Sequence, residues 1–239
     1  RFSIVKPRMI VCVPSGITEV EERAVIQAAM EAGARRVYLI EEPLAAALGA
    51  HLDVSAPEGR MVVDIGGGTT DIGVITMNGV AISSSIKVAG TQFDEVIIKY
   101  VRKRFGVIIG ANTAEEIKLS IGCVSPRPAS LTMTAKGRDV KSGLAHEFTV
   151  TSEEIMEVLR RPARQIADRV LDVLEQTTPE LVADISKNGI LLTGGGSQLW
   201  GMDQVLRDRT EMNCVVADDA DSCVAYGCGK SLGWVNHMP

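Results

Sequence analysis

Two glycine clusters, far apart in the sequence, limit what this chain can fold into more than any other feature. They are Gly66-Gly67-Gly68 and Gly194-Gly195-Gly196, and each follows a short apolar run that predicts a buried strand. Glycine lets the backbone approach a ligand closely, and the N–H groups of such a loop suit phosphate or ribose oxygens. One cluster would be weak evidence, because glycines also form turns. Two clusters, each joined to acidic or hydroxyl side chains, predict a nucleotide held between two lobes.

The sequence after the first cluster narrows the class of nucleotide site. An apolar run over 71–77 predicts a second strand, and Asn78-Gly79 is predicted to turn the chain into a third strand over 80–88. The first glycine cluster therefore joins two strands of a meander. A P-loop or a dinucleotide-binding fingerprint would instead lead from a strand into a helix. Both of those classes are excluded.

Composition restricts the compartment and the partners. The 239 residues suit one large domain or two modest ones, and no apolar run approaches the roughly 18 residues of a membrane span. A net charge of −5 without a basic run argues against nucleic acid as a partner. Five scattered cysteines without a CxxC pair, and isolated histidines, predict a reducing cytoplasm and no zinc site.

Strand and helix signals alternate along the chain, which predicts an α/β fold. Thr18 and Glu21 form a capping box, and Pro162 interrupts a long helical pattern that Thr151 and Glu154 open. The other expected elements are strands at 8–14, 37–40, 61–88 (as the meander) and 190–193, helices at 18–33, 43–49, 93–105 and 222–232, a helix capped by Thr113, and a small β-rich region at 124–147.

These motifs resemble the ATPase superfamily of actin, sugar kinases and the seventy-kilodalton chaperones, and the chain is most similar to the MreB family of bacterial actin homologues. The similar stretches follow the family order over nearly the whole chain. They are Lys6-Pro7-Arg8, Cys12–Thr18, Ile40-Glu41-Glu42-Pro43-Leu44-Ala45-Ala46-Ala47, Val62–Thr70, Thr113–Lys118 and Gly189–Ser197.

The resemblance implies an α/β fold of the actin-like ATPase (ribonuclease H-like) type, with two lobes around a nucleotide cleft. The first lobe would contain residues 1–56, joined by a C-terminal helix over 222–239. The second lobe would have its core in 57–92 and 157–221, and a small insertion subdomain in 93–156. No Asp-x-Gly-Thr phosphate loop occurs near the start, so the first lobe is expected to be incomplete, lacking about the first quarter of a subunit by length. The chain by itself is then expected to bind ATP weakly and to be inactive as an ATP hydrolase.

Asp64 and Thr69 flank the first glycine cluster and are candidate catalytic residues. Magnesium binds through few carboxylates together with waters and phosphates, so Asp64 is predicted to hold a magnesium-bound water; the alternative is a turn or cap aspartate. The resemblance implies that Thr69 orients the attacking water, although it could simply begin the next strand. Asp71 is expected to point away from the face of Thr70 and to affect only a surface contact.

Glu41 and Glu42 are adjacent, and only one of them can face the cleft. Counting from the shared Pro-x-Ala-Ala-Ala pattern assigns Glu42 as the general base, with Glu41 as the fallback. A carboxylate suits this role because it accepts a hydrogen bond from the water near the γ-phosphate. Both could instead be helix N-terminal acids favoured by the helix dipole.

The remaining site residues are candidate nucleotide contacts. The N–H groups of Gly66, Gly67 and Gly68 are predicted to bind the β- and γ-phosphates. Glu115 and Lys118 share one helix face, and the resemblance implies that they contact ribose and adenine; the alternative is an exposed ion pair. The second cluster, with Ser197, is predicted to border the α-phosphate and ribose, unless Gly194, Gly195 and Gly196 form a generic strand-to-helix loop.

The implied function is that of an ATP-binding and ATP-hydrolysing cytoskeletal protein, with ATP and Mg²⁺ as cofactors, that polymerises into membrane-associated filaments governing rod cell shape and cell-wall synthesis. Its implied partners are copies of itself, the cell-wall elongation machinery and the inner surface of the membrane. Phe2 and Ile4 beside basic residues suit a membrane interface, or else a strand approach. The alternatives are a chaperone or small-molecule kinase with the same core, and a non-hydrolysing structural fragment.

Overall fold

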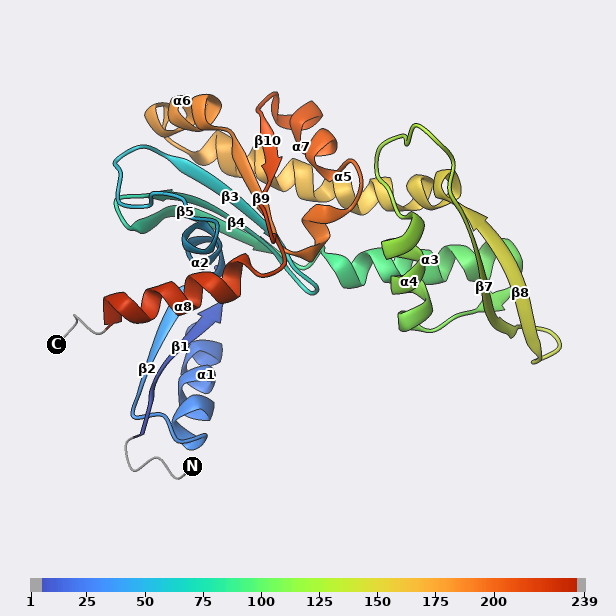
Figure 1. Cartoon of the computed structure of the whole chain (residues 1–239), viewed down its shortest axis with the longest axis horizontal. Helices are drawn as coiled ribbons and strands as arrows, with labels where there is room; N and C mark the ends of the chain where they lie inside the picture. The colour runs from blue at the N-terminus through green and yellow to red at the C-terminus, as the bar shows by residue number, and fades with distance from the viewer. Residues whose placement is uncertain (1–5, 236–239) are drawn as a thin grey trace.

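The computed structural model describes residues 6–235, with side chains up to residue 233, and these residues form a two-, a five- and a three-stranded sheet (Figure 1). Phe2 and Ile4 lie outside this range, so their predicted contact with a membrane stays a prediction. No helix within the range is long and apolar enough to cross a membrane. The domain limits predicted above also stay predictions.

The first part of the chain confirms the predicted alternation. The parallel strands β1 (Arg8–Val13) and β2 (Arg36–Glu41) form the two-stranded sheet, with α1 (Glu19–Glu31) between them in sequence. The capping box of Thr18 and Glu21 is present at the start of α1. Helix α2 (Glu42–Gly49) begins directly after β2, with Pro43 in its first turn, where the missing N–H costs nothing.

The five-stranded sheet places the two glycine clusters beside each other. Its order is β10-β9-β3-β4-β5, and the meander β3-β4-β5 is antiparallel, as predicted. Strand β9 runs parallel to β3, so the two glycine clusters leave the sheet at the same edge. The bounds are β3 (Arg60–Ile65), β4 (Thr70–Thr76), β5 (Gly79–Ile86), β9 (Ile190–Thr193) and β10 (Cys214–Val216).

The turn between β4 and β5 lies one residue earlier than predicted. Thr76 pairs with Gly79, and the two turn residues are Met77 and Asn78, with φ of 50° and 63°. Their N–H groups donate to the carbonyls of Ala56 and Val54, at 3.0 and 2.7 Å. These bonds to the preceding loop hold the pair in the left-handed conformation, so Gly79 is the first residue of β5 instead of part of the turn.

Helices α3 and α5 extend from the five-stranded sheet to the three-stranded one (Figure 1). The predicted capping box opens α5, which continues through the buried Pro162. Thr113 is not a cap, because α4 already begins after Gly110. The bounds are α3 (Gly90–Phe105), α4 (Ala111–Ile121), α5 (Ser152–Gln176), α6 (Pro179–Asn188), α7 (Met202–Thr210), β6 (Val107–Ile108), β7 (Thr132–Asp139) and β8 (Ala145–Thr151).

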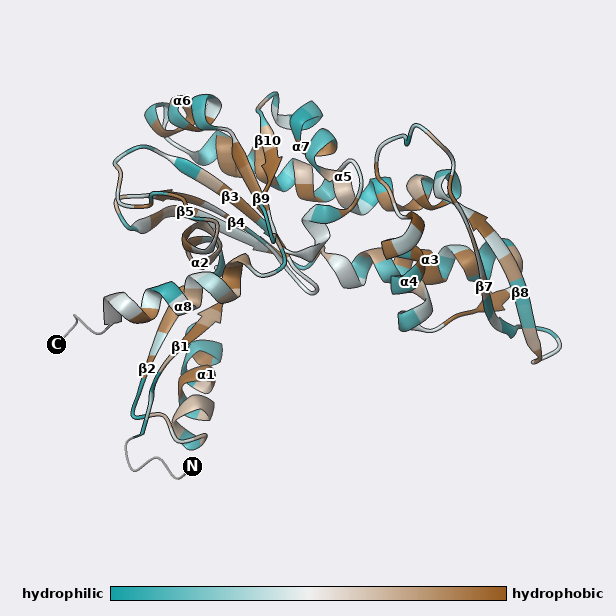
Figure 2. Ribbon diagram, in the orientation of Figure 1, coloured by the Kyte–Doolittle hydropathy of each residue, from teal (hydrophilic) through white to brown (hydrophobic). Residues whose placement is uncertain are grey.

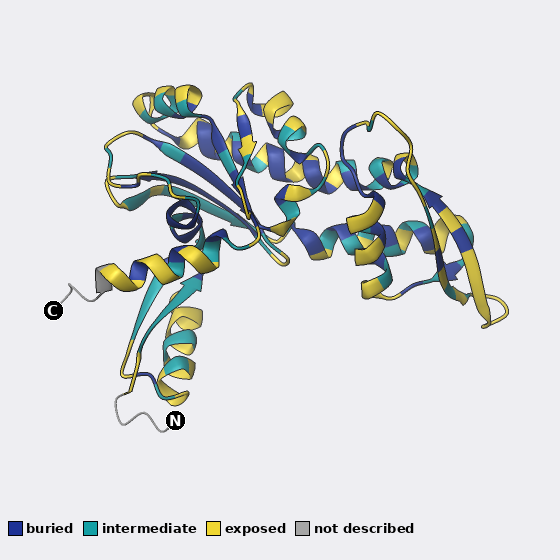
Figure 3. Ribbon diagram, viewed as in Figure 1, coloured by how far each residue is buried: buried dark blue, intermediate teal, exposed yellow. Residues whose placement is uncertain are grey.

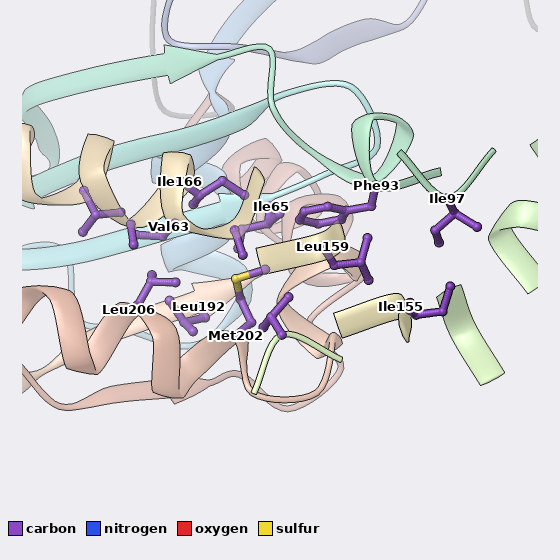
Figure 4. Close-up of a cluster of buried hydrophobic side chains, with 14 of the residues drawn as sticks. Val63, Ile65, Phe93, Ile97, Ile155, Leu159, Ile166, Leu192, Met202 and Leu206 are labelled. Atoms are coloured by element: carbon purple, nitrogen blue, oxygen red, sulfur yellow. The ribbon is translucent and has the colours of Figure 1, made fainter. Parts of the chain in front are cut away.

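Both faces of the five-stranded sheet are buried, because successive side chains of a strand point to opposite faces. Val63 and Ile65 pack against α3, α5 and α7 in the main core (Figure 4). Val62 and Ile75 belong to a second core with the alanines of α2. The central strands are accordingly apolar and dark blue in the burial view (Figures 2 and 3). Any polar side chain on these strands must therefore find a partner or serve a site.

The second core depends on close contact between α2 and α8 (Cys223–Val235). A Cβ added at Gly227 would overlap the backbone carbonyl of Ala45, and one added at Gly49 would overlap that of Cys223. The two helices therefore touch through their backbones at glycines, which leaves no room for a side chain.

We expect Gly227→Ala to lower the free energy of unfolding by about 1–3 kcal/mol, as for overpacking of a core. Gly229→Ala is the matched control, since a Cβ there meets nothing within 4 Å and alanine favours a helix. Thermal unfolding of the full-length variants gives the comparison. A Gly227→Ala midpoint equal to that of the control would show that the helices separate easily.

Candidate functional site

The ends of β3 and β9 meet at Asp64 and Thr193, which are paired in register. The Thr193 hydroxyl donates to Asp64 Oδ1 at 2.6 Å, and both side chains are buried. The glycine clusters that follow these residues are thus held side by side, although 129 positions separate Asp64 from Thr193 in the sequence.

The first glycine cluster forms a tight loop in which some backbone N–H groups form no hydrogen bond within the described residues. Gly66 N–H donates to the Thr69 carbonyl at 3.0 Å, so it is not a free phosphate donor. The carbonyls of Gly66 and Gly67 accept hydrogen bonds from Gly90 and Thr91 at the start of α3. The N–H groups of Gly67 and Gly68 have no partner within residues 6–235, and a Cβ added to either would meet nothing within 4 Å. Of the three predicted donors, Gly67 and Gly68 are the available ones.

In the second cluster, two glycines are required by close packing and the third faces open space. Gly194 has a φ of 78°, and Cβ atoms added at Gly194 or Gly196 would collide with Ile65. Only a Cβ at Gly195 would project into open space. The Ser197 hydroxyl is buried and donates to the Gly194 carbonyl at 2.7 Å. Ser197 therefore supports the loop, and the structure does not bring its hydroxyl to the site.

A cavity of about 350 Å³ opens beside both clusters, within the roughly 300–1,000 Å³ typical of small-molecule sites. Glu115 and Lys118 belong to its wall, as do residues that the sequence did not single out. The full lining is Gly66, Gly67, Gly90, Phe93, Glu115, Lys118, Leu119, Gly122, Arg127, Gly195, Gly196, Gln198, Leu199 and Trp200.

Lys118 is fixed at the cavity wall by a partner other than Glu115. Its Nζ lies 2.9 Å from Asp94 Oδ1 and donates to the Gly90 carbonyl at 3.3 Å. The side chains of Lys118 and Asp94 are only 13% and 16% exposed, so this ion pair is little screened by solvent. The alternative of an exposed ion pair between Glu115 and Lys118 does not occur.

Arg127 and Trp200 form a part of the cavity that no sequence motif revealed. The Arg127 guanidinium lies 4.9 Å from the centre of the Trp200 ring, and Trp200 Nε1 donates to the Pro126 carbonyl at 3.4 Å. Planar cationic and aromatic side chains of this kind stack on nucleobases. Only their positions in space indicate a binding role, because they come from different loops.

Two aspartates face α2 from the five-stranded sheet. Asp64 on β3 and Asp71 on β4 are directly opposite in the antiparallel register, so their side chains share one face. The first turn of α2 lies on the same face, because a Cβ added at Gly73 would be 2.6 Å from the Cβ of Pro43. Glu42, next to Pro43, is thereby brought close to both aspartates.

The carboxyl groups of Glu42 and Asp64 have perturbed acidities. Burial raises the pKa of Asp64 from 3.8 to about 6, although the hydrogen bond from Thr193 opposes this rise. Burial, followed by the charges of Asp71 and Asp64, raises the pKa of Glu42 from 4.5 to about 7. Glu41 lies elsewhere, where its Oε2 accepts a hydrogen bond from the Ser83 hydroxyl at 3.3 Å. The structure thus places Glu42, and not Glu41, against the aspartates.

Asp71 corrects the expectation of a surface contact. It does lie on the face opposite Thr70, whose hydroxyl donates to the Val88 carbonyl, but it is fully buried. Its Oδ1 accepts the N–H of Ser15 at 2.8 Å. Alternation along β4 gave the correct direction of the side chain, whereas the burial comes from α2 and the Ser15 loop, which cover that face.

Two further predictions concern Thr69 and magnesium. Thr69 is half-buried, and its carbonyl accepts the hydrogen bond that closes the glycine loop. Among residues 6–235, no group of three or more His, Cys, Asp or Glu side chains converges tightly enough to hold a metal ion. The catalytic and metal-binding roles of Glu42, Asp64 and Thr69 remain predictions.

Comparison with known proteins shows the family of this chain. A family model described as MreB/Mbl protein matches residues 1–238. This chain belongs to the MreB/Mbl family. The cell shape-determining protein MreB of Escherichia coli (strain K12) is 49% identical over 230 residues, covering 96% of this chain and 66% of that protein. The cell shape-determining protein Mbl of Bacillus subtilis (strain 168) is 44% identical over 234 residues, 98% of this chain and 70% of the relative. The chain thus spans about two thirds of the length of these MreB/Mbl relatives.

Solved structures confirm the predicted actin-like fold. MreB5 of Spiroplasma citri bound to ADP has a TM-score of 0.92 and 39% identity, over 95% of this chain and 69% of that one. The same protein bound to AMPPNP also has a TM-score of 0.92. The MamK double helical filament, at 20% identity and a TM-score of 0.80 over 100% of this chain and 71% of that one, shares the fold alone.

Proposed function

We propose that this MreB/Mbl chain is part of an ATP-binding subunit, and that copies of this subunit assemble into filaments that determine cell shape. One observation carries the proposal: two glycine loops from adjacent strand ends border a cavity, and buried carboxyl groups lie directly behind one of them. Support comes from the relative MreB5, whose structures are described as bound to ADP and AMPPNP, and from relatives described as cell shape-determining.

The residues of the cavity fit a nucleotide. The unpartnered N–H groups of Gly67 and Gly68 suit phosphate oxygens, and the missing Cβ atoms at Gly67 and Gly195 leave room for close approach. Glu115 can accept hydrogen bonds from ribose hydroxyls, while Lys118, whose charge is balanced by Asp94, offers N–H donors at the wall.

The carboxyl groups suit hydrolysis of the bound nucleotide. Glu42 would accept a proton from a water whose oxygen forms a bond to the γ-phosphorus, as the bond to the β–γ bridging oxygen breaks and ADP leaves. A base works best when its pKa lies near the working pH, and that of Glu42 is about 7. Thr69 would orient the water. Asp64 would hold magnesium through a water, and the metal would neutralise charge on the phosphates.

Membrane association on the cytoplasmic face, through Phe2 and Ile4, and guidance of the cell-wall elongation machinery complete the proposal. Self-association would form the filament, and hydrolysis would weaken it. These parts rest on the family resemblance and on the apolar residues beside Lys6 and Arg8.

Calorimetric titration of the full-length protein with ATP, together with phosphate release and sedimentation of filaments, tests the proposal. We expect saturable magnesium-dependent binding, slow phosphate release and ATP-dependent sedimentation. Binding without phosphate release would favour a non-hydrolysing structural role, and no binding would overturn the proposal.

A leucine at Gly195 locates the binding site. Because a side chain there enters open space at the cavity, Gly195→Leu should weaken ATP binding by about tenfold, or about 1.4 kcal/mol, while leaving thermal stability unchanged. Gly229→Leu, also in open space but on α8, is the matched control. Equal affinities for the two variants would show that the nucleotide binds elsewhere.

A further inference from the structure

Asp71 carries a buried carboxylate oxygen that has no hydrogen-bond partner. The residue is fully buried, and Oδ1 is fixed by the Ser15 N–H at 2.8 Å. Oδ2 has no partner among the described residues. A buried polar atom without a partner is unfavourable and therefore points to a ligand or to a functional arrangement.

The surroundings of Asp71 show what this oxygen faces. Asp64 is its register partner on β3, and Glu42 approaches from α2 through the contact of Pro43 with Gly73. The proximity of Glu42 and Asp71 is expressed in the raised pKa of Glu42, to which the charge of Asp71 contributes. A side-chain hydrogen bond with Asp71 is a further cause of this rise, so the two carboxyl groups lie within reach of each other. A protonated carboxyl group carries one O–H donor, so the two groups can bond directly.

We propose that Asp71 is a positioning residue that orients the Glu42 carboxyl group through direct contact between the two side chains. The Ser15 N–H holds Oδ1, which restricts rotation of the Asp71 carboxylate, and Asp71 lies on the face of the sheet that the first turn of α2 covers. The inference rests on the proposed function, because it matters only if Glu42 accepts the proton of the attacking water. It adds a residue on β4, outside the glycine loops, to the groups that set the rate.

Asp71→Asn in the full-length protein is the direct test. Asparagine keeps the shape and the acceptor for the Ser15 N–H, but it replaces Oδ2 by an N–H donor, which would bond the Glu42 carboxylate and make it a weaker base. We expect kcat for ATP hydrolysis to fall about tenfold, with KM and the unfolding midpoint nearly unchanged, as for partial loss of general-base assistance. Asp71→Glu restores a carboxylate and should recover part of the rate.

A double-mutant cycle separates positioning from a structural role. If Asp71 acts through Glu42, Asp71→Asn should have no further effect on kcat in a Glu42→Gln background. The same loss in both backgrounds would overturn the inference, and so would a wild-type kcat for Asp71→Asn. In both of those cases wild-type hydrolysis would still support the proposed function. A wild-type protein that does not hydrolyse ATP would overturn the two together.

Discussion

Asp64→Asn should abolish magnesium-dependent ATP hydrolysis in the full-length protein and at the same time make it more stable at neutral pH. Asparagine retains an oxygen that accepts the Thr193 hydroxyl, so the register of β3 and β9 is kept. It cannot supply the negative charge that would hold a magnesium-bound water. Phosphate release measured against wild type tests the first half, and an unchanged rate would remove Asp64 from the catalytic residues.

The gain in stability follows from the raised pKa of Asp64. Between pH 3.8 and about 6 the folded state keeps a proton that the unfolded state releases. The wild type is thus at its most stable, with respect to this group, below pH 3.8, and it loses that stability as pH rises to about 6. A shift of about two units corresponds to at most about 3 kcal/mol. Without nucleotide or magnesium, Asp64→Asn should unfold at higher denaturant than wild type at pH 8, and the difference should disappear near pH 4. A constant difference at both pH values would contradict this account.

Local patterns predicted the elements on which the site is built. The Thr18 and Thr151 capping boxes, the meander and the strand before each glycine cluster all depend on residues close in sequence, and the structure confirms them. The adjacency of the two clusters was also predictable, because each follows a buried strand and a nucleotide would need both.

Features that depend on contacts between distant segments could not be predicted. The turn at Met77-Asn78 is set by carbonyls of residues 54 and 56, and the burial of Asp71 is set by α2 and Ser15. Arg127 and Trp200 meet only in the folded chain. Within the second glycine cluster, the sequence gives no reason to assign different roles to the three glycines. Only the contact with Ile65 separates the structural glycines, Gly194 and Gly196, from the open one.

The choice between Glu41 and Glu42 shows where prediction from the sequence ends and contacts in the folded chain are needed. Both acids suit a helix N-terminus, and counting from the alanines favoured Glu42 without excluding its neighbour. The structure separates them because β2 ends at Glu41, whose side chain reaches Ser83, while the first residue of α2 faces the aspartates. This separation supplies a matched pair of variants for the general base.

Glu42→Gln should slow ATP hydrolysis by about a hundredfold, within the range for loss of a general base, while ATP binding stays near normal. Filaments should then persist longer, because hydrolysis would no longer weaken them. Glu41→Gln is the control, since the Glu41 side chain is bonded to Ser83 and the amide oxygen can still accept that hydrogen bond. If Glu41→Gln alone showed the slow phenotype, the register assigned to this helix would be wrong.

The pH dependence of hydrolysis provides a second test of Glu42 as the general base. A base with a pKa of about 7 is mostly protonated at pH 6 and mostly ionised at pH 8, so the wild-type rate should rise about tenfold across this interval. Glutamine does not titrate, so the residual rate of Glu42→Gln should be nearly flat over the same range. The Glu41→Gln variant should keep the wild-type rise. A rise of equal size in Glu42→Gln would mean that another group supplies the base, and the raised pKa of Glu42 would then reflect only its burial beside Asp71 and Asp64.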